Sequence, residues 1–140
     1  MANTITTQIL VDGPKNVVVK IDGFVDTSDL SATTLLDPAT LSVIDSNGNK
    51  PTKLRIDKII YDIEDQLSCN LSWDATTPVL IWHLLGRNKL EFDKKYGGLQ
   101  NNAGAGVTGK ITMVTQGWST AAILSFSIVL ECTKQWVPNV

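Results

Sequence analysis

Apolar and polar residues alternate along most of this chain with a repeat of two residues. The clearest case is residues 67–73, where Leu, Cys, Leu and Trp alternate with Ser, Asn and Ser. Such alternation is typical of a β-strand that buries one face and exposes the other to water. Residues 17–25 and 122–132 follow the same pattern, and no segment shows the repeat of an amphipathic helix. We therefore predict an all-β protein.

About eight strand-like segments are separated by turn signals such as Asp12-Gly13-Pro14 and Asn47-Gly48. Short strands at this spacing indicate a β-sandwich or a barrel. A length of 140 residues fits one domain with its own core. We predict a single-domain β-sandwich or jelly-roll-like barrel over residues 1–140. Residues 26–42 are predicted to be mostly loop, and residues 40–44 could form a short strand.

Two positions interrupt the alternation. In residues 53–63, Leu54 and Ile56 lie on one face, whereas the apolar residues from Ile59 onward lie on the other. The face switches near Asp57, which predicts either a β-bulge or a strand that crosses between two sheets. Gly23 interrupts an earlier strand and indicates a bulge or a close approach of another part of the backbone.

Residues 78–85 differ from the other strands because apolar residues occupy both predicted faces. Leu80, Trp82 and Leu84 would share one face, and His83 would lie on the other between apolar neighbours. A strand that is apolar on both faces is either covered on both sides or meets another subunit. We predict that Leu80, Trp82 and Leu84 form an interface. His83 is predicted to be a core or interface residue with a satisfied hydrogen bond rather than a general base.

Residues 96–109 contain five of the ten glycines in the chain and end in Gly104-x-x-x-x-Gly109-Lys110. This ending is one residue short of a phosphate-binding P-loop. A P-loop requires Ser or Thr after the lysine and a helix whose N-terminus holds the phosphate. Here Ile111 follows the lysine, and β-forming residues come next. We therefore expect a long structural loop rather than a nucleotide site.

Composition and charge exclude several classes of function. The net charge is −2 and the 12 basic residues are scattered, so we expect no nucleic-acid binding. The first residues lack the basic and apolar regions of a signal peptide, and no apolar run is long enough to cross a membrane. We expect synthesis in a cytosol, with Cys69 and Cys132 as buried thiols rather than a disulfide.

Candidate catalytic and metal-binding residues are few. One histidine and two distant cysteines do not complete a metal site, and residues 45–49 lack the later glutamate of a calcium loop. Asp62 and Glu64 lie two residues apart on one strand face, a spacing compatible with an inverting glycosidase. Asp65 and Gln66 follow them, which is typical of a solvated turn. We predict no catalytic residues, no metal and no cofactor. A carbohydrate-binding module or small glycan hydrolase is the alternative from another class.

Several strings of the sequence resemble a family of small proteins encoded by tailed bacteriophages. They are ANTITTQILVDGPKNVVVK at residues 2–20, KPTKLRI at 50–56, LSWDATT at 71–77, and YGGLQNNAGAGVTGKI at 96–111 followed by QGW. Members of this family are described as virion structural proteins. The resemblance covers most of the chain and is most specific between residues 96 and 111. It carries no catalytic residues with it.

The resemblance implies a structural component of the virion. A small acidic β-protein of this kind is expected to be a capsid decoration, or cement, protein. Such proteins are compact domains, often trimeric, that clamp adjacent major capsid proteins on the outer capsid surface. The implied partners are the major capsid protein and other copies of this chain, made in the host cytoplasm. The alternative within a phage is a tail, neck or receptor-contacting accessory protein.

Two extended segments are expected to reach over the capsid: an N-terminal arm at residues 1–8 and the loop at residues 96–109. In the loop, Asn101 and Asn102 would bond to capsid backbone, since glycines allow close approach. The full set of predicted interface residues is Leu80, Trp82, Leu84, Leu99, Asn101, Asn102, Trp118 and Trp136.

Overall fold

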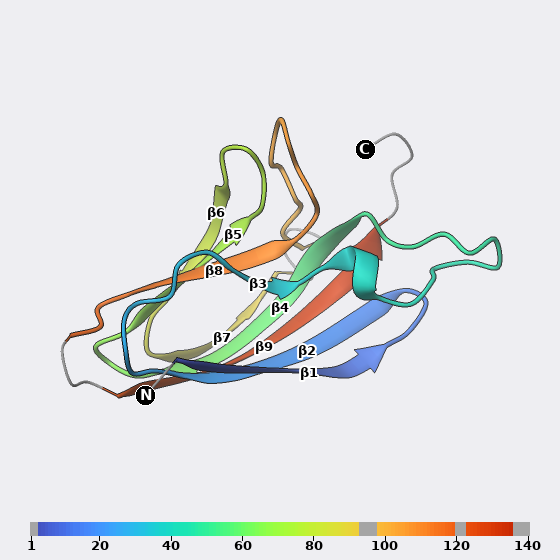
Figure 1. Ribbon diagram of the computed structural model, residues 1–140. Helices are drawn as coiled ribbons and strands as arrows, with labels where there is room; N and C mark the ends of the chain where they lie inside the picture. Colours follow the sequence, from blue (N-terminus) through green and yellow to red (C-terminus); the bar gives the residue numbers. More distant parts are fainter. Residues whose placement is uncertain (1–2, 93–97, 120–122, 136–140) are drawn as a thin grey trace.

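The computed structural model describes residues 3–92, 98–119 and 123–135, and over these ranges the protein is all-β, as predicted. Two antiparallel sheets lie face to face and form an open β-sandwich (Figure 1). One sheet has five strands in the order β1-β2-β9-β4-β7, and the other has four in the order β3-β8-β5-β6. We call them the five-stranded and the four-stranded sheet.

The nine strands found in the described ranges include two that are long enough to run the length of the sandwich. Their bounds are β1 (Thr4–Asp12), β2 (Asn16–Val25), β3 (Thr33–Leu36), β4 (Lys53–Ile63), β5 (Ser68–Trp73), β6 (Val79–Leu84), β7 (Arg87–Glu91), β8 (Ile111–Gln116) and β9 (Leu124–Gln135). The two longest, β4 and β9, pair along most of their length.

The centre of the five-stranded sheet is β9, which pairs with β2 on one side and β4 on the other. The register between β4 and β9 shifts between Ile56 and Lys58. The predicted change of face near Asp57 is therefore a β-bulge within one sheet. Because of this bulge, Ile56 and Ile59 are both buried although they are three residues apart.

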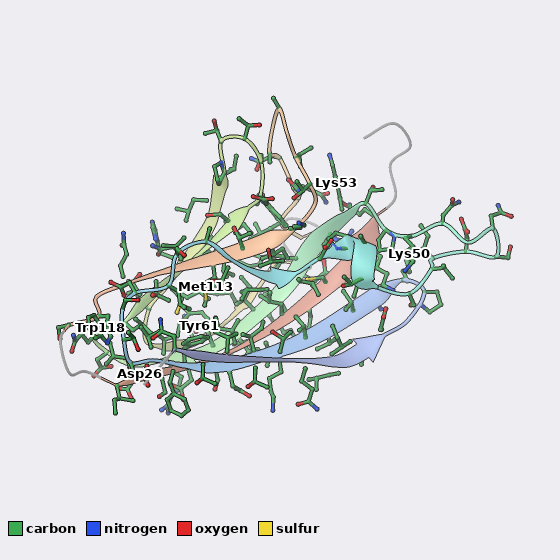
Figure 2. All side chains as sticks on the ribbon, in the orientation of Figure 1. Asp26, Lys50, Lys53, Tyr61, Met113 and Trp118 are labelled. Atoms are coloured by element: carbon green, nitrogen blue, oxygen red, sulfur yellow. The ribbon has the colours of Figure 1, made fainter. Side chains whose placement is uncertain are left out.

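The core fills the space between the two sheets. Figure 2 shows Tyr61 of β4 and Met113 of β8 in this space, and both side chains are buried. Cys69 and Cys132 are buried and unbonded, as predicted. At Gly23 the alternative of close approach is correct, because a β-carbon there would lie 2.8 Å from the ring of Phe126.

Residues 26–42 contain more structure than the predicted loop. They include β3 and a short 3-10 turn, η1 (Pro38–Thr40). Asp37 caps this turn, since its Oδ1 accepts a hydrogen bond of 3.0 Å from the amide of Ala39. The prediction of a strand at residues 40–44 is wrong, because Thr40 belongs to the capped turn and residues 41–44 form no strand after it.

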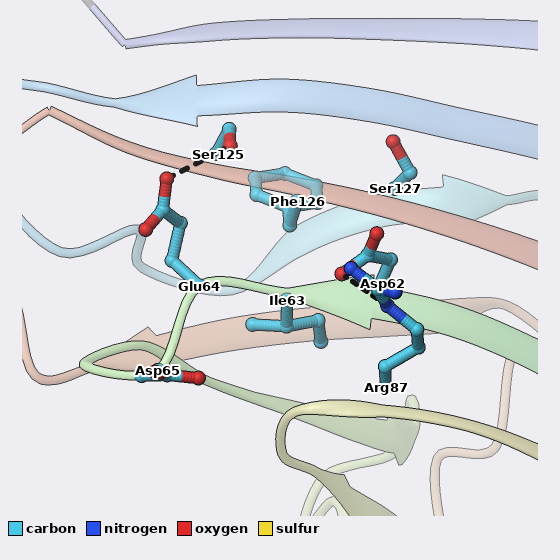
Figure 3. Close-up of a pocket in the computed structure, with 8 residues that line it drawn as sticks. All are labelled: Asp62, Ile63, Glu64, Asp65, Arg87, Ser125, Phe126 and Ser127. Carbon is cyan, nitrogen blue, oxygen red and sulfur yellow. Dashed lines mark hydrogen bonds and ion pairs between the residues drawn. The ribbon is translucent and has the colours of Figure 1, made fainter.

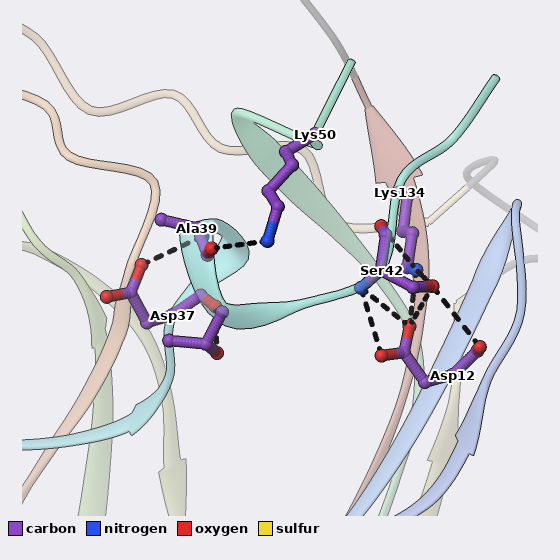
Figure 4. A network of polar contacts seen from close by, with 7 residues as sticks. Asp12, Asp37, Ala39, Ser42, Lys50 and Lys134 are labelled. Atoms are coloured by element: carbon purple, nitrogen blue, oxygen red, sulfur yellow. Dashed lines mark hydrogen bonds and ion pairs between the residues drawn. The ribbon is translucent and has the colours of Figure 1, made fainter. Parts of the chain in front are cut away.

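A polar network fastens this segment to the two sheet strands beneath it (Figure 4). Lys134 of β9 donates to the carboxylate of Asp12 at the end of β1, and also to Oγ and the backbone oxygen of Ser42 at 3.0 and 3.2 Å. The amide of Ser42 donates in turn to Asp12 Oδ2 at 3.0 Å. Nearby, Lys50 donates to the backbone oxygen of Ala39 at 3.4 Å.

Within the described residues, the N-terminal segment predicted as an extended arm is part of a sheet. Residues 4–8 belong to β1, which pairs antiparallel with β2 at the edge of the five-stranded sheet. Asn3 holds the start of this strand: its Oδ1 accepts from the amides of Asp26 and Thr27 at 2.9 and 3.0 Å. The β-forming Thr and Ile residues of this segment pair with β2 through the backbone groups that face it.

Candidate interaction surfaces

The predicted shared face of Leu80, Trp82 and Leu84 does not exist in the structure. Leu84 and Trp82 pair with Cys69 and Leu71, whose side chains face the core, whereas Leu80 pairs with Ser72. Residues directly opposite in a sheet share a face. The register shift between Leu80 and Trp82 inserts one extra residue into β6, so Leu80 points outward and Leu84 inward. Leu80 is 47% exposed and Leu84 is fully buried.

Trp82 faces inward but lies at the open edge of the sandwich, where it is 40% exposed. Its ring packs against that of Phe92, with centroids 5.4 Å apart and planes inclined by 58°. This tilted geometry is favourable for aromatic pairs and fixes the position of the indole. Leu85, in the turn after β6, is also exposed. We refer to the exposed apolar residues of this edge, Leu80 on the outer face of β6, Trp82 on its inner face and Leu85 in the turn, as the β6 surface.

His83 lies beside the β6 surface and faces outward. It pairs across the strands with Asn70, and its Nδ1 is 2.6 Å from the side-chain oxygen of that asparagine. An amide oxygen only accepts, so Nδ1 carries the hydrogen in this contact. The prediction of a satisfied histidine agrees with this bond, but its surroundings are polar and solvated rather than apolar.

The glycine-rich loop is fastened to the sandwich at both ends. Leu99 forms a β-bridge with Ile56 through hydrogen bonds of 2.7 and 3.0 Å. At the other end, Thr108 donates through its amide and its hydroxyl to Asp74 at 3.2 and 2.8 Å. Lys110 then leads directly into β8, a strand, so there is no helix N-terminus to hold a phosphate.

The two asparagines of the loop differ in their accessibility. Asn102 is exposed, and its predicted contact with the capsid stays a prediction. Asn101 is 9% exposed, and its Oδ1 accepts a hydrogen bond of 3.0 Å from the amide of Ala103. Its Nδ2 is buried and has no acceptor among the described residues. Asn101 therefore shapes the loop from within and is not placed to bond to a partner's backbone.

The remaining predicted interface residues have different positions. Leu99 and Trp118 are partly buried and pack against the core. Trp118 lies at one end of the sandwich (Figure 2), and its amide donates to Asp29 Oδ1 at 3.1 Å. The structure therefore exposes Leu80 and Trp82 on opposite faces of β6 and places Leu99 and Trp118 elsewhere. Trp136, Gly97 and the first two residues lie outside the described residues.

Asp62 and Glu64 line a hollow where β4 ends and β9 begins (Figure 3). Arg87 Nε is 3.4 Å from Asp62 Oδ1, and Ser125 donates to Glu64 Oε1 at 3.2 Å. Both carboxylates are exposed to solvent. A glycosidase keeps one carboxyl neutral by burying it, and sugar sites present aromatic rings. The aromatic residue beside this hollow, Phe126, is buried in the core, so the hollow has the character of a solvated ion pair.

The outer edge of β1 forms a second surface with apolar side chains. Ile9, Leu10 and Val11 are all exposed, and Ile9 is 44% exposed although it faces the same side as the core residues of β2. In the described strands, the sequence from Thr4 to Val11 is the longest edge segment without a charged residue. The sequence indicates a strand at residues 5–11 as well as an extended arm at residues 1–8, and the structure shows the strand.

The two thiols are buried, and the acidic residues of the described ranges do not gather into a metal site. Burial raises the pKa of the Cys69 thiol to about 12, and burial also raises the pKa of Cys132, with Asp57 and Glu131 contributing. Within residues 3–92, 98–119 and 123–135, no group of three or more His, Cys, Asp or Glu side chains could hold a metal ion. The same ranges contain no helix long and apolar enough to span a membrane.

Comparison with known proteins adds no relative: no family model, no curated protein and no solved structure matches the chain.

Proposed function

We propose that this protein is a capsid decoration protein of a tailed-phage virion, which binds adjacent major capsid proteins and stabilises the shell. The proposal rests on the resemblance of residues 2–20 and 96–111 to virion structural proteins. The role is structural and requires no catalysis. A ligand that binds only the assembled shell stabilises it by mass action at every site.

The observation that carries the proposal is the exposed β6 surface. Leu80, Trp82 and Leu85 place two aliphatic side chains and one aromatic side chain on an edge of the sandwich. Tryptophan is among the residues that contribute most to protein interfaces, especially when a neighbour holds it in place. Phe92 provides that support here. We infer that the β6 surface contacts the major capsid protein, with Trp82 as the anchor.

The direct test is binding of the purified protein to expanded capsids that lack it. Trp82→Ala and Leu80→Asp should each weaken binding by roughly tenfold or more if the residues are central to the interface. Thr77→Asp, at an exposed position in the turn before β6, is the matched control. Wild-type protein that does not bind the capsid, or variants that bind as tightly as wild type, would contradict the assignment.

A gel of purified particles separates the shell from the tail. A band in stoichiometric proportion to the major capsid protein is expected for a decoration protein. A few copies per particle would instead favour the tail, neck or receptor-contacting alternative. Glycan binding that is lost in Glu64→Gln would favour the carbohydrate alternative.

A further inference from the structure

Over residues 4–9, the edge strand β1 lacks the features by which proteins prevent their sheet edges from pairing with other strands. Short edge strands, charged side chains, proline and bulges are the usual protections. Of the other described edges, β7 carries Arg87, Lys89 and Glu91, β3 has only four residues, and β6 is bulged near Ile81. In β1, residues 4–9 pair with β2 in regular register and carry no charge. This edge therefore has free backbone groups in a regular strand.

We propose that the free edge of β1 pairs antiparallel with β1 of a second copy of this chain, about a two-fold axis at Thr7. In this register Thr7 lies opposite Thr7 of the second copy, and Ile5 lies opposite Ile9 in both directions. Thr6 then lies opposite Gln8. The two five-stranded sheets become one continuous sheet, and backbone hydrogen bonds across the axis satisfy the free edge groups.

The side chains of β1 favour this register over its neighbours. Ile5, Thr7 and Ile9 share the face of β2 residues Gly23, Ile21 and Val19, which is the core-facing side. Ile–Ile and Thr–Thr pairs across antiparallel strands are favourable. The neighbouring registers are less favourable. An axis at Gln8 would extend the pairing across the irregular backbone at Leu10, and an axis at Thr6 would place Ile5 opposite Thr7 in place of Ile9.

Charge also favours a second copy as the occupant. The only charged residue of β1 is Asp12, at the far end of the strand. With the axis at Thr7, the two Asp12 residues are separated by ten strand positions, or about 33 Å. Like charges at that distance are screened at physiological ionic strength. The pairing therefore brings no like charges together and covers part of the exposed side chain of Ile9.

The position of β1 in the fold gives the dimer a consequence for the proposed function. β1 and β7 are the opposite edges of the five-stranded sheet, and β6 joins β7 through Leu85 and Gly86 alone. Pairing through β1 leaves the two β6 surfaces at the far ends of the dimer. One dimer would then reach two capsid subunits. Binding of two capsid subunits by one dimer rests on the proposed function, whereas the pairing of two β1 strands does not. The pairing gives a dimer in place of the trimer that the resemblance implies.

The test measures the mass of the purified protein in solution without capsids. Sedimentation equilibrium of the wild type should give twice the chain mass of 15.2 kDa. Thr7→Lys and Thr7→Glu each place like charges opposite one another at the axis, and each should raise the dimer dissociation constant at least roughly tenfold. An equal mixture of the two variants should restore the dimer, because lysine then faces glutamate. Ser46→Lys, at an exposed turn position, is the control and should remain dimeric.

Site-directed cross-linking provides a second readout if the charged variants fail to fold. Cysteines opposite each other in antiparallel strands lie within the Cα separation of a disulfide. Thr7→Cys should form a cross-linked dimer under mild oxidation, whereas Ser46→Cys should not; both native cysteines are buried and should not compete.

Three results would overturn the pairing. They are a wild type that is monomeric at all concentrations, a Thr7→Lys variant that folds and remains dimeric, and a Thr7→Cys variant that cross-links no faster than Ser46→Cys. If Thr7→Lys abolishes capsid binding by a monomeric wild type, the occupant of the edge is a strand of the capsid protein instead. Capsid binding that fails while the dimer forms would contradict only the proposed function.

Discussion

Lys134 and Asp12 form an ion pair in which the lysine side chain has no exposed surface while the aspartate side chain is 28% exposed. Lys134 lies opposite Leu54 on the core-facing side of β9, and Asp12 ends β1. The three hydrogens of the ammonium group are matched by Asp12 and the two oxygens of Ser42. The pair therefore ties the edge strand and the segment after η1 to the centre of the sheet.

Removing the two partners should have unequal effects on stability. Asp12→Asn leaves a buried ammonium without its counter-charge and should lower the free energy of unfolding by about 2–4 kcal/mol. This loss is smaller than for a fully buried pair because Asp12 is partly exposed. Lys134→Met removes the buried charge and keeps the packing, and should cost only about 0–2 kcal/mol. Urea unfolding at neutral pH measures both. Equal losses would contradict this account.

The same pair should make stability depend on pH in the acid range. Burial raises the pKa of Asp12, but hydrogen bonds from Lys134 and Ser42 outweigh it, so the pKa lies below its ordinary value of 3.8. A carboxyl with a lowered pKa in the folded state contributes stability that is fully present above the unfolded pKa and is lost as pH falls through the folded one. Unfolding curves at neutral pH and at successive values below 3.8 should show this loss. The loss should be smaller in Asp12→Asn, and an equal loss would rule out Asp12 as its source.

The cysteines should be unreactive in the folded protein. Thiolates are the reactive species, and burial holds the pKa of Cys69 at about 12 and raises that of Cys132. Ellman's reagent at mildly alkaline pH should therefore detect no thiol in the native protein and two after denaturation. The exposed thiol of Ser46→Cys is the positive control and should react at once. Rapid labelling of the native wild type would mean that the sandwich opens easily.

Gly23→Ala should destabilise the protein through packing. A β-carbon at this position would meet the backbone oxygen of Thr4 and lie 2.8 Å from the Phe126 ring. Overpacking of this kind costs about 1–3 kcal/mol, or a fall in Tm of roughly 3–10 °C for a chain of this length. Gly104→Ala is the matched control because nothing lies within 4 Å of its β-carbon. Thermal unfolding followed by circular dichroism compares the two, and equal Tm values would contradict the close approach.

Leu80 and Leu84 should differ in their effects although they belong to the same strand. Leu84→Ala creates a cavity in the core and should cost about 2–5 kcal/mol. Leu80→Ala changes an exposed side chain and should alter stability by no more than about 0.5 kcal/mol. Chemical denaturation of both variants measures the difference. Similar losses would mean that β6 has the unbulged register which alternation alone predicts.

Strand identity and much of the core could be predicted because they depend on near neighbours in the chain. In β5 and β9 the apolar residues alternate with polar ones, so the pattern itself indicates which face is buried. The bulge near Asp57 was visible for the same reason, as a change of face between Ile56 and Ile59. Burial of the two cysteines followed from their places in these patterns.

The candidate surfaces could be predicted only in part. In β6, apolar residues occupy nearly every position, so alternation gives no sign of the extra residue that turns Leu80 outward and Leu84 inward. Residues 4–8 have the composition of a strand, but only pairing with β2 distinguishes a sheet edge from a free arm. From the sequence, Asn101 and Asn102 are both expected to be exposed loop residues, but Asn101 is buried in the folded protein.

The sequence by itself determined that the chain forms β-strands, where most of them lie and which thiols are buried, because a pleated strand sorts its own residues onto two faces. The tertiary structure alone decided which edge is free, where β6 is bulged and why Lys134 is buried. Those features depend on partners far away in the chain: Asp12 is 122 residues from Lys134 and Ser42 is 92 residues from it. A charged side chain can be buried only where its hydrogen-bond and ion-pair partners lie beside it, and the residues next to Lys134 in the sequence do not indicate those partners.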